Sequence, residues 1–178
     1  KYGYPKTWES SYAKNTVKHL REIIEIMSEG GVLSTGTLSL QSLDQATLDT
    51  IRRSNISVSK YEDLAVEFGN NDLALVMELM MGLPGSTVTS FLGDLQQIID
   101  REVRARVNPT EVLMNSPMND PEYRSRYQIV VDDRGLVIGS HTFDLADYHR
   151  MERLRLLYRA SEHLVHARDR NDLEPTLD

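Results

Sequence analysis

Residues 72–82 read DLALVMELMMG, and the turn GLPGS at 82–86 follows them directly. Such a nearly continuous apolar run is typical of a strand that is buried on both faces of a parallel sheet. The residues after the turn repeat apolar side chains at the spacing of one helical face: Val88, Phe91, Leu92, Leu95, Ile98 and Ile99. A strand, a tight turn and an amphipathic helix in this order predict one β/α unit.

The same order of elements recurs on both sides of this unit. The sequence predicts further strands over 7–12, 37–41 and 107–114, and further helices over 13–29, 44–51 and 59–68. Asp44 is suited to cap the second of these helices, and Ser59 with Glu62 forms a capping box at the start of the third. We therefore expect an α/β fold, a partial β/α barrel of parallel strands whose order in the sheet follows the sequence.

The pattern changes after residue 127. The stretch QIVVDDRGLVIGS at 128–140 predicts a β-hairpin around a DDRG turn, and a long helix is predicted from Asp144 to about Arg168. We therefore expect a barrel part over 1–127, a hairpin and helix extension of the same domain over 128–168, and a polar, frayed tail over 169–178.

The composition of the 178-residue chain excludes several classes of protein. Hydrophobic residues make up 40% and charged residues 26%, which separates the chain from disordered tails. No apolar run approaches the ~20 residues that span a bilayer, and the net charge of −7 argues against nucleic acid as a partner. The sequence contains no cysteine, which excludes disulfides, a catalytic thiol and a cysteine-bound iron–sulfur cluster or zinc ion within the chain.

The chain begins at Lys1 rather than at a methionine, and its opening KYGYPKTW has no features of a signal peptide. We therefore expect a piece of a longer, cytoplasmic protein. An incomplete barrel leaves an open strand edge, which we expect at Thr7–Tyr12. Another chain would cover this edge, or the piece would self-associate through it.

In parallel α/β folds, ligands bind beyond the carboxyl ends of the strands, so polar residues at these ends form the candidate site. Gln41 ends the strand predicted over 37–41, and Glu78 lies inside the apolar run. An unpaired carboxylate in such a run is costly, so Glu78 requires a partner or a ligand, and Arg53 is a candidate neighbour. Two interpretations stay open. Glu78 and Arg53 form a structural ion pair while Gln41 caps a helix, or the three residues bind a ligand.

Two stretches resemble a known family: LSLQSLDQATLDTIRRSN at 38–55 and VMELMMGLPGST at 76–87. Both are similar to the C-terminal half of the radical S-adenosylmethionine (SAM) enzyme core, most of all to members that carry an N-terminal cobalamin-binding domain. The layout also resembles oxygen-independent coproporphyrinogen oxidase, and the resemblance covers about residues 1–168. It implies a TIM-barrel-like core, of which residues 1–127 would supply the C-terminal strands.

The resemblance rests on the order and spacing of polar residues. Arg53 lies 12 residues and Glu78 lies 37 residues after Gln41. The family places a glutamine, an arginine and an acidic residue in this order. The resemblance therefore implies that Gln41 and Arg53 hold the methionine carboxylate of SAM, and that Glu78 holds its ribose or amino group. The backbone around Gly82 would line the adenine.

The resemblance implies a fragment of a radical SAM iron–sulfur enzyme of the cobalamin-dependent type, an oxidoreductase or methyltransferase. Asn115 and Ser116 would face its small-molecule substrate. A [4Fe-4S] cluster and cobalamin would be bound in the full-length protein only, because the three-cysteine motif of the family is absent from this chain. Ser86 also departs from the family pattern, which has an acidic residue after GLPG.

We therefore expect the chain alone to be inactive, with the missing N-terminal part of its parent protein as its partner. The alternative, from another class, is a binding or scaffold domain that kept the barrel fold and lost the cluster. A C-x-x-x-C-x-x-C motif encoded upstream of Lys1 would distinguish the enzyme from the scaffold.

Overall fold

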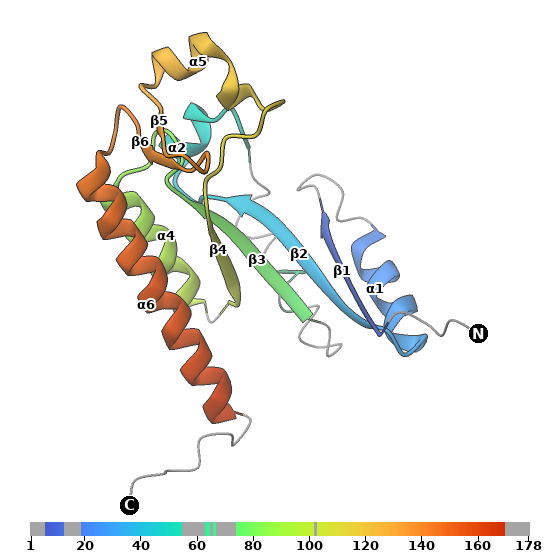
Figure 1. The fold of residues 1–178 in the computed structure, drawn as a ribbon. Coiled ribbons are helices and arrows are strands. Elements are labelled where there is room, and N and C mark those ends of the chain that lie inside the picture. The colour runs from blue at the N-terminus through green and yellow to red at the C-terminus, as the bar shows by residue number, and fades with distance from the viewer. Residues whose placement is uncertain are drawn as a thin grey trace, which may run out of the picture.

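The computed structural model describes residues 6–12, 19–54, 63–64, 66, 74–101 and 103–169. It contains a four-stranded parallel sheet in the order β1-β2-β3-β4 (Figure 1). The strands are β1 (Thr7–Tyr12), β2 (Leu33–Gln41), β3 (Ala74–Met81) and β4 (Ala105–Pro109). The helices between them include α1 (Leu20–Glu29), α2 (Gln45–Thr50) and α4 (Val88–Asp100). The strand order follows the sequence, so the predicted α/β fold with parallel strands is confirmed.

One face of the sheet is buried under helices. Met77, Leu79 and Met81 alternate along β3 and are at most 2% exposed. Other strands and helices complete this core with Ile24, Leu38, Leu40, Phe91, Leu95, Ile98, Ala105, Val107, Met151 and Tyr158. Alternate residues of a strand point to the same face, so the period of two in burial identifies this face as the core. Each fully buried Leu, Ile or Met side chain contributes about 1.5–3 kcal/mol to folding relative to an exposed one.

The opposite face of the sheet is polar toward the carboxyl ends of the strands. Ser39 and Glu78 pair in register and are half-buried, and Asn108 is exposed. Nearer the start of the strands, Thr37 and Val76 on the same face are 1% and 7% exposed. The expectation that β3 is buried on both faces is therefore correct only in part, because Glu78 interrupts the burial of this second face.

Two strand boundaries differ from the prediction. β2 begins at Leu33 rather than at 37, and its added residues pair with β1. β4 ends at Pro109 rather than at 114. Proline has no N–H to donate to a sheet, and Thr110 binds the Met81 carbonyl oxygen through its N–H (2.9 Å) and its hydroxyl (2.8 Å). These two hydrogen bonds hold Thr110 at the end of β3, and β4 ends one residue before it.

The helices follow the predicted pattern where they are described. α2 begins after Asp44, whose carboxylate accepts the Thr47 N–H at 2.8 Å, as the capping prediction requires. α4 coincides with the predicted apolar stripe and starts with a capping box at Thr87. Residues 13–18 of the first predicted helix, and most of the helix predicted over 59–68, lie outside the described residues.

A C-terminal extension follows β4. It contains the 3-10 helix η2 (Pro117–Asn119), α5 (Pro121–Arg126), the antiparallel hairpin of β5 (Val130–Val131) and β6 (Val137–Gly139), and α6 (Leu145–Asp169). The predicted hairpin and long helix are confirmed. In Figure 1, α2, α5 and the hairpin gather at the carboxyl ends of β2, β3 and β4. None of the described helices, the 25 residues of α6 included, is long and apolar enough to cross a membrane.

Side chains of α6 reach the outer edge of β4, which is one end of the sheet. Glu162 accepts the Ala105 N–H at 3.1 Å and the Tyr158 hydroxyl at 2.6 Å. Arg155 donates to the Val107 carbonyl oxygen at 3.5 Å. Free backbone groups of an edge strand are otherwise open to pairing with another chain. α6 therefore closes part of the β4 edge, while β1, the predicted open edge, forms the other end of the sheet.

Replacing Glu162 with alanine is expected to lower the free energy of unfolding by about 1–3 kcal/mol, because the Ala105 N–H loses its acceptor beside the core. Tyr158→Phe removes only a hydroxyl donor and is expected to cost about 1 kcal/mol. Urea unfolding followed by circular dichroism measures both changes.

Glu29→Ala is the matched control, at an exposed position near the end of α1. It should stay within about 0.5 kcal/mol of the wild-type chain. Equal stability of Glu162→Ala and Glu29→Ala would contradict the anchoring of β4 by α6.

Candidate functional site

Gln41 ends β2 in an unusual backbone conformation. Its φ is +70°, and the Ser42 N–H donates to the Leu40 carbonyl oxygen at 2.9 Å. This pattern is a γ-turn, and a non-glycine residue held in such a conformation costs on the order of 1–3 kcal/mol. The pairing with β3 also shifts register between Ser39 and Gln41, so a bulge ends the strand here. Strained residues of this kind cluster at functional sites, which makes Gln41 a candidate on structural grounds.

A buried carboxylate from α4 holds the turn that follows Gln41. Asp94 is 4% exposed, and its two oxygens accept the Ser42 hydroxyl (2.7 Å) and the Leu43 N–H (3.1 Å). The Ser42 oxygen in turn accepts the Asp44 N–H at 3.1 Å. Asp94 was not predicted as a site residue from the sequence. The signal that could have found it is its position on the apolar face of α4, where a carboxylate must have partners.

Burial raises the pKa of the Asp94 carboxyl to about 6. The Ser42 hydroxyl and the backbone N–H groups of Leu43 and Asp44 favour the ionised form and oppose this rise, whereas the negative charge of Asp44 adds to it. The folded chain therefore keeps a proton on Asp94 at a higher pH than the unfolded chain, in which an aspartate has its ordinary pKa of 3.8. The resulting contribution to stability is fully present below pH 3.8 and is lost as the pH rises through about 6.

The free energy of unfolding of the wild-type chain, relative to that of Asp94→Asn, is expected to fall as the pH rises from about 4 to about 7. A pKa difference of about 2 corresponds to about 3 kcal/mol. Urea unfolding of both proteins across this pH range measures the difference. The subtraction removes the opposite contribution of Glu152, whose pKa is lowered by its hydrogen bond to Arg155. A difference that does not change with pH would contradict the burial of Asp94.

Glu78 takes part in a hydrogen-bonded row across three strands. Its carboxylate accepts the Ser39 hydroxyl of β2 at 2.5 Å and the Asn108 side-chain amide of β4 at 2.9 Å. All three side chains lie on the face opposite to Met77 and the covering helices. Two donors orient the carboxylate and leave further lone pairs on its oxygens for a ligand. Asn108 was missed because the strand predicted over 107–114 placed the end of β4 too late.

Arg53 is not the partner of Glu78. It follows α2 in an exposed turn, where its N–H donates to the Leu48 carbonyl oxygen at 2.9 Å. Among the described residues no ion pair joins Arg53 and Glu78, so their interpretation as an internal ion pair is wrong. Gln41 does not cap a helix either, because Asp44 caps α2. A ligand-binding role for Gln41, Arg53 and Glu78 stays a prediction.

The GLPG turn after β3 packs against two neighbouring segments. Gly82 is buried with a φ of +80°, and a Cβ atom there would lie 3.1 Å from the Val137 carbonyl oxygen of β6. Gly85 has a φ of +93°, and a Cβ atom there would lie 2.5 Å from the Thr50 hydroxyl oxygen of α2. The GLPG turn therefore packs against the hairpin at Gly82 and against α2 at Gly85, and both close approaches require glycine. The role of Gly82 beside an adenine stays a prediction.

Gly85→Ala is expected to destabilise the chain more than Gly31→Ala. Gly31 has a similar φ of +73° but open space around it, so alanine there reports the backbone strain alone, about 1–2 kcal/mol. At Gly85 the contact with Thr50 adds about 1–3 kcal/mol of overpacking. Thermal or urea unfolding measures the loss of unfolding free energy in both variants. Equal losses would show that the contact between the turn and Thr50 of α2 adds no cost.

Asn115 and Ser116 lie in a turn beyond the end of β4, because the strand stops at Pro109. Asn115 is exposed, and the Ser116 hydroxyl donates to the Leu113 carbonyl oxygen at 2.9 Å, at the start of η2. They are therefore not strand-end residues. Their role facing a substrate stays a prediction.

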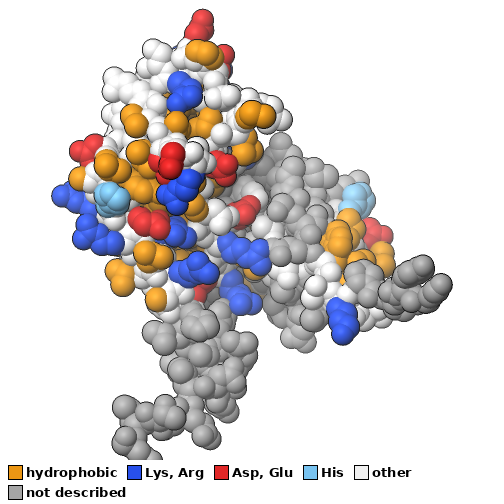
Figure 2. Space-filling model, in the orientation of Figure 1, with side chains coloured by type: hydrophobic (Ala, Val, Ile, Leu, Met, Phe, Trp, Pro, Cys, Tyr) orange, Lys and Arg blue, Asp and Glu red, His pale blue; other side chains and the backbone are white. Residues whose placement is uncertain are grey.

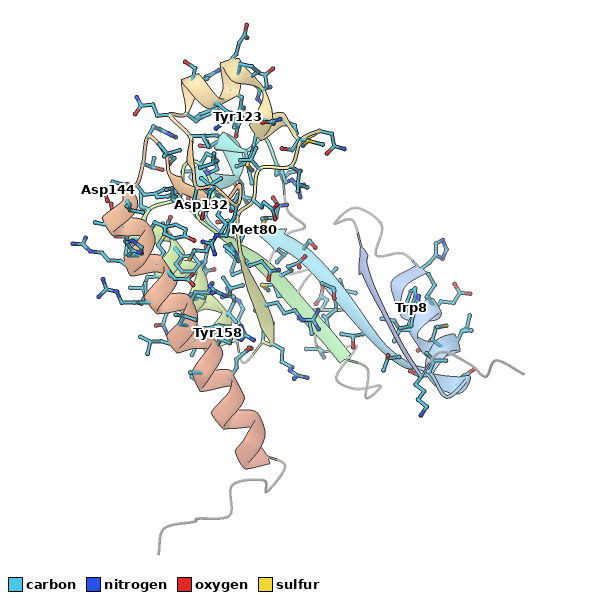
Figure 3. All side chains as sticks on the ribbon, viewed as in Figure 1. Trp8, Met80, Tyr123, Asp132, Asp144 and Tyr158 are labelled. Carbon is cyan, nitrogen blue, oxygen red and sulfur yellow. The ribbon has the colours of Figure 1, made fainter. Side chains whose placement is uncertain are left out.

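A pocket of about 400 Å³ lies between α5 and the turn after α2. It is lined by Arg52, Pro117, Asp120, Glu122, Tyr123 and Arg126. The Tyr123 hydroxyl donates to the Thr50 carbonyl oxygen at 3.2 Å and joins α5 to α2, and Figure 3 shows Tyr123 at the end of the molecule where these helices meet. The pocket adjoins Arg53 through its neighbour Arg52. It offers space for a ligand beside the turn that follows α2.

A second pocket, of about 340 Å³, lies along the β4 edge and is lined in part by Arg106, Arg155, Arg159 and Glu162. Figure 2 shows Lys and Arg side chains interspersed with acidic ones on this face of the molecule. The charges are therefore mixed rather than of one sign. Within the described part of the chain, no group of three His, Cys, Asp or Glu side chains is placed to hold a metal ion.

Two curated proteins are similar to this chain over 128 residues, which is 70% of its length. The identity is 31% to the cobalamin-dependent radical SAM methyltransferase TokK of Streptomyces tokunonensis. It is 32% to 2-(S-pantetheinyl)-carbapenam-3-carboxylate methyltransferase of Streptantibioticus cattleyicolor. The chain spans 19% of the length of each relative. No protein-family model matches it.

Among solved structures, coproporphyrinogen III oxidase (HemN) of Escherichia coli, a radical SAM enzyme, has a similar fold. The TM-score is 0.55 over 87% of this chain and 32% of that one. The sequence identity is 11%, so this likeness concerns the fold alone. The sequence relatives and the fold together confirm the resemblance that the sequence analysis identified.

Proposed function

We propose that this chain, a homologue of cobalamin-dependent radical SAM methyltransferases, forms one side of the SAM site in a longer enzyme of that type. In this proposal Gln41 and Arg53 bind the methionine carboxylate, Glu78 binds the ribose or amino group, and the backbone at Gly82 lines the adenine. The observation that carries the proposal is the strained turn at Gln41, which stands beside the oriented carboxylate of Glu78 at the carboxyl ends of adjacent strands.

The chemistry of these side chains fits the ligand groups. The Gln41 amide and the Arg53 guanidinium supply N–H donors, which a carboxylate requires. Glu78 supplies acceptors for hydroxyl or ammonium groups. Ser39 and Asn108 each occupy one site on its oxygens and restrict its rotation. The polar face at the strand ends therefore offers donors and acceptors for the two ends of SAM.

The residues of this chain do not fit an iron–sulfur cluster. Such clusters are held by thiolates, and the sequence contains no cysteine. In radical SAM enzymes the cluster and SAM together supply the radical chemistry. This chain would bind and orient one reactant of that chemistry, and the cluster and cobalamin would be held by other parts of the longer protein. The chain alone is then inactive.

The substrate is proposed to be a small molecule that approaches the carboxyl ends of the strands. Asn115, Ser116 and the pocket beside Tyr123 all lie in the segments between β4 and the hairpin. These segments differ in kind from the buried core, because they are exposed turns that tolerate changes of sequence. Substrate selection would therefore be built into them rather than into the sheet.

In the longer protein, Gln41→Ala, Arg53→Ala and Glu78→Gln are each expected to weaken SAM binding by about tenfold to a hundredfold, because each removes a charged or directed hydrogen bond. Equilibrium binding of SAM and anaerobic formation of 5′-deoxyadenosine measure the effects. The 178-residue chain alone should form no 5′-deoxyadenosine.

Arg104→Ala is the matched control, since Arg104 is an exposed arginine just before β4, at the opposite end of the strand from the site. It should leave SAM binding unchanged. Activity of the isolated chain, or wild-type binding in all three site variants, would refute the proposed function in favour of a scaffold role.

A further inference from the structure

The turn after Gln41 is held by a continuous chain of hydrogen bonds that begins on α4. Asp94 accepts from Ser42 and Leu43, and the Ser42 oxygen accepts the Asp44 N–H. Asp44 caps α2 by accepting from both the backbone N–H (2.8 Å) and the hydroxyl (2.7 Å) of Thr47. One buried carboxylate is therefore linked to the residues that directly follow Gln41 and, through Asp44, to the first turn of α2.

The two proposed carboxylate-binding residues flank this linked segment. Gln41 precedes Ser42, whose N–H closes the γ-turn on Leu40. Arg53 lies beyond α2 and is attached to it by its own N–H, which donates to the Leu48 carbonyl oxygen. The segment from 42 to 48 is a short, capped unit, so a displacement at Ser42 shifts both ends. Asp94 therefore holds the segment between Gln41 and Arg53, although no described hydrogen bond joins it to either residue.

We propose that Asp94 is a positioning residue that acts through Ser42 to set the place of Gln41 and, through α2, of Arg53. The inference rests on the proposed function. It adds that the affinity of the site for the carboxylate end of its ligand depends on a side chain that does not touch the ligand.

The form of the contact favours a positioning role over simple burial of a polar group. A carboxylate offers one oxygen to the Ser42 hydroxyl and the other to the Leu43 N–H. An asparagine side chain has a single acceptor oxygen, and its NH₂ group would face one of these donors. Asp94 therefore fixes two neighbouring residues of the turn in a way that its closest neutral analogue does not reproduce.

The surroundings of Asp94 also make the turn sensitive to pH. The charged group near Asp94 is the Asp44 carboxylate, on the segment that Asp94 holds. The other groups that act on Asp94 are neutral donors: the Ser42 hydroxyl and the backbone N–H groups of Leu43 and Asp44. Because the pKa of Asp94 is about 6, Asp94 gains or loses its proton near pH 6. Carboxylates with ordinary pKa values of about 4 stay ionised at this pH. Protonation removes acceptor capacity from the carboxylate and therefore changes the hydrogen bonds that hold the turn.

The test compares Asp94→Asn, Ser42→Ala and their double variant in the longer protein, with Asp100→Asn as the control. Asp100 is an exposed aspartate at the end of the same helix. We expect Asp94→Asn to weaken SAM binding by about tenfold, the lower end of the range for residues that orient direct contacts. Ser42→Ala should act similarly, and the double variant should be no weaker than either single variant, because both remove the same link. Additive effects would overturn the route through Ser42.

A second measurement uses the wild-type 178-residue chain and needs no variant to fold. The backbone amide resonances of Gln41 and Leu43 should titrate together with an apparent pKa of about 6, that of Asp94. Their independence of pH would overturn the proposal. If Gln41→Ala weakens SAM binding and Asp94→Asn does not, only this inference fails. If both variants bind SAM as the wild type does, the proposed function fails with it.

Discussion

Burial of one face of the parallel sheet determines where the polar residues of the chain can lie. Met77, Leu79 and Met81 alternate along β3 and are packed under the helices. A shift of the strand by one residue would carry Glu78 into this core and would expose its apolar neighbours. The register that builds the core therefore also places Glu78 beside Ser39 and Asn108 on the opposite face. The alternation of side chains along β3 thus forms the buried core on one face and places Glu78 of the candidate site on the other.

Several energetically unfavourable features of the described residues lie at the carboxyl ends of the strands. Gln41 has a positive φ, Asp94 is a buried carboxylate, and Gly85 has a positive φ and lies so close to Thr50 that a Cβ atom would force a shift. Each feature costs free energy that the rest of the fold offsets. The hairpin and α5 pack at the same end, and they hold these turns where a less constrained loop would relax (Figure 1).

The proposed function divides the chemistry between this chain and the rest of a longer protein. The amide, guanidinium and carboxylate groups of Gln41, Arg53 and Glu78 are proposed to bind the polar ends of SAM, whereas a cluster requires thiolates and the sequence contains no cysteine. The relatives are nearly four times as long as this chain, since the 128 matched residues span 19% of each of them. A cofactor that bridges distant segments of a barrel makes this separation possible, because parallel strands bring their carboxyl ends to one place.

Local patterns in the sequence determined the elements, and tertiary structure decided their partners. Apolar periodicity predicted β3, α4, the hairpin and α6, and Asp44 predicted the start of α2, because these features depend on residues within a few positions of one another. The sequence likewise placed Gln41 at the end of its strand. The contacts of Asp94 with Ser42, and of Asn108 with Glu78, join residues 52 and 30 positions apart. The end of β4 depends on Thr110 reaching Met81 across the sheet. No local period carries such information, since a buried polar group takes whichever partner the fold places beside it.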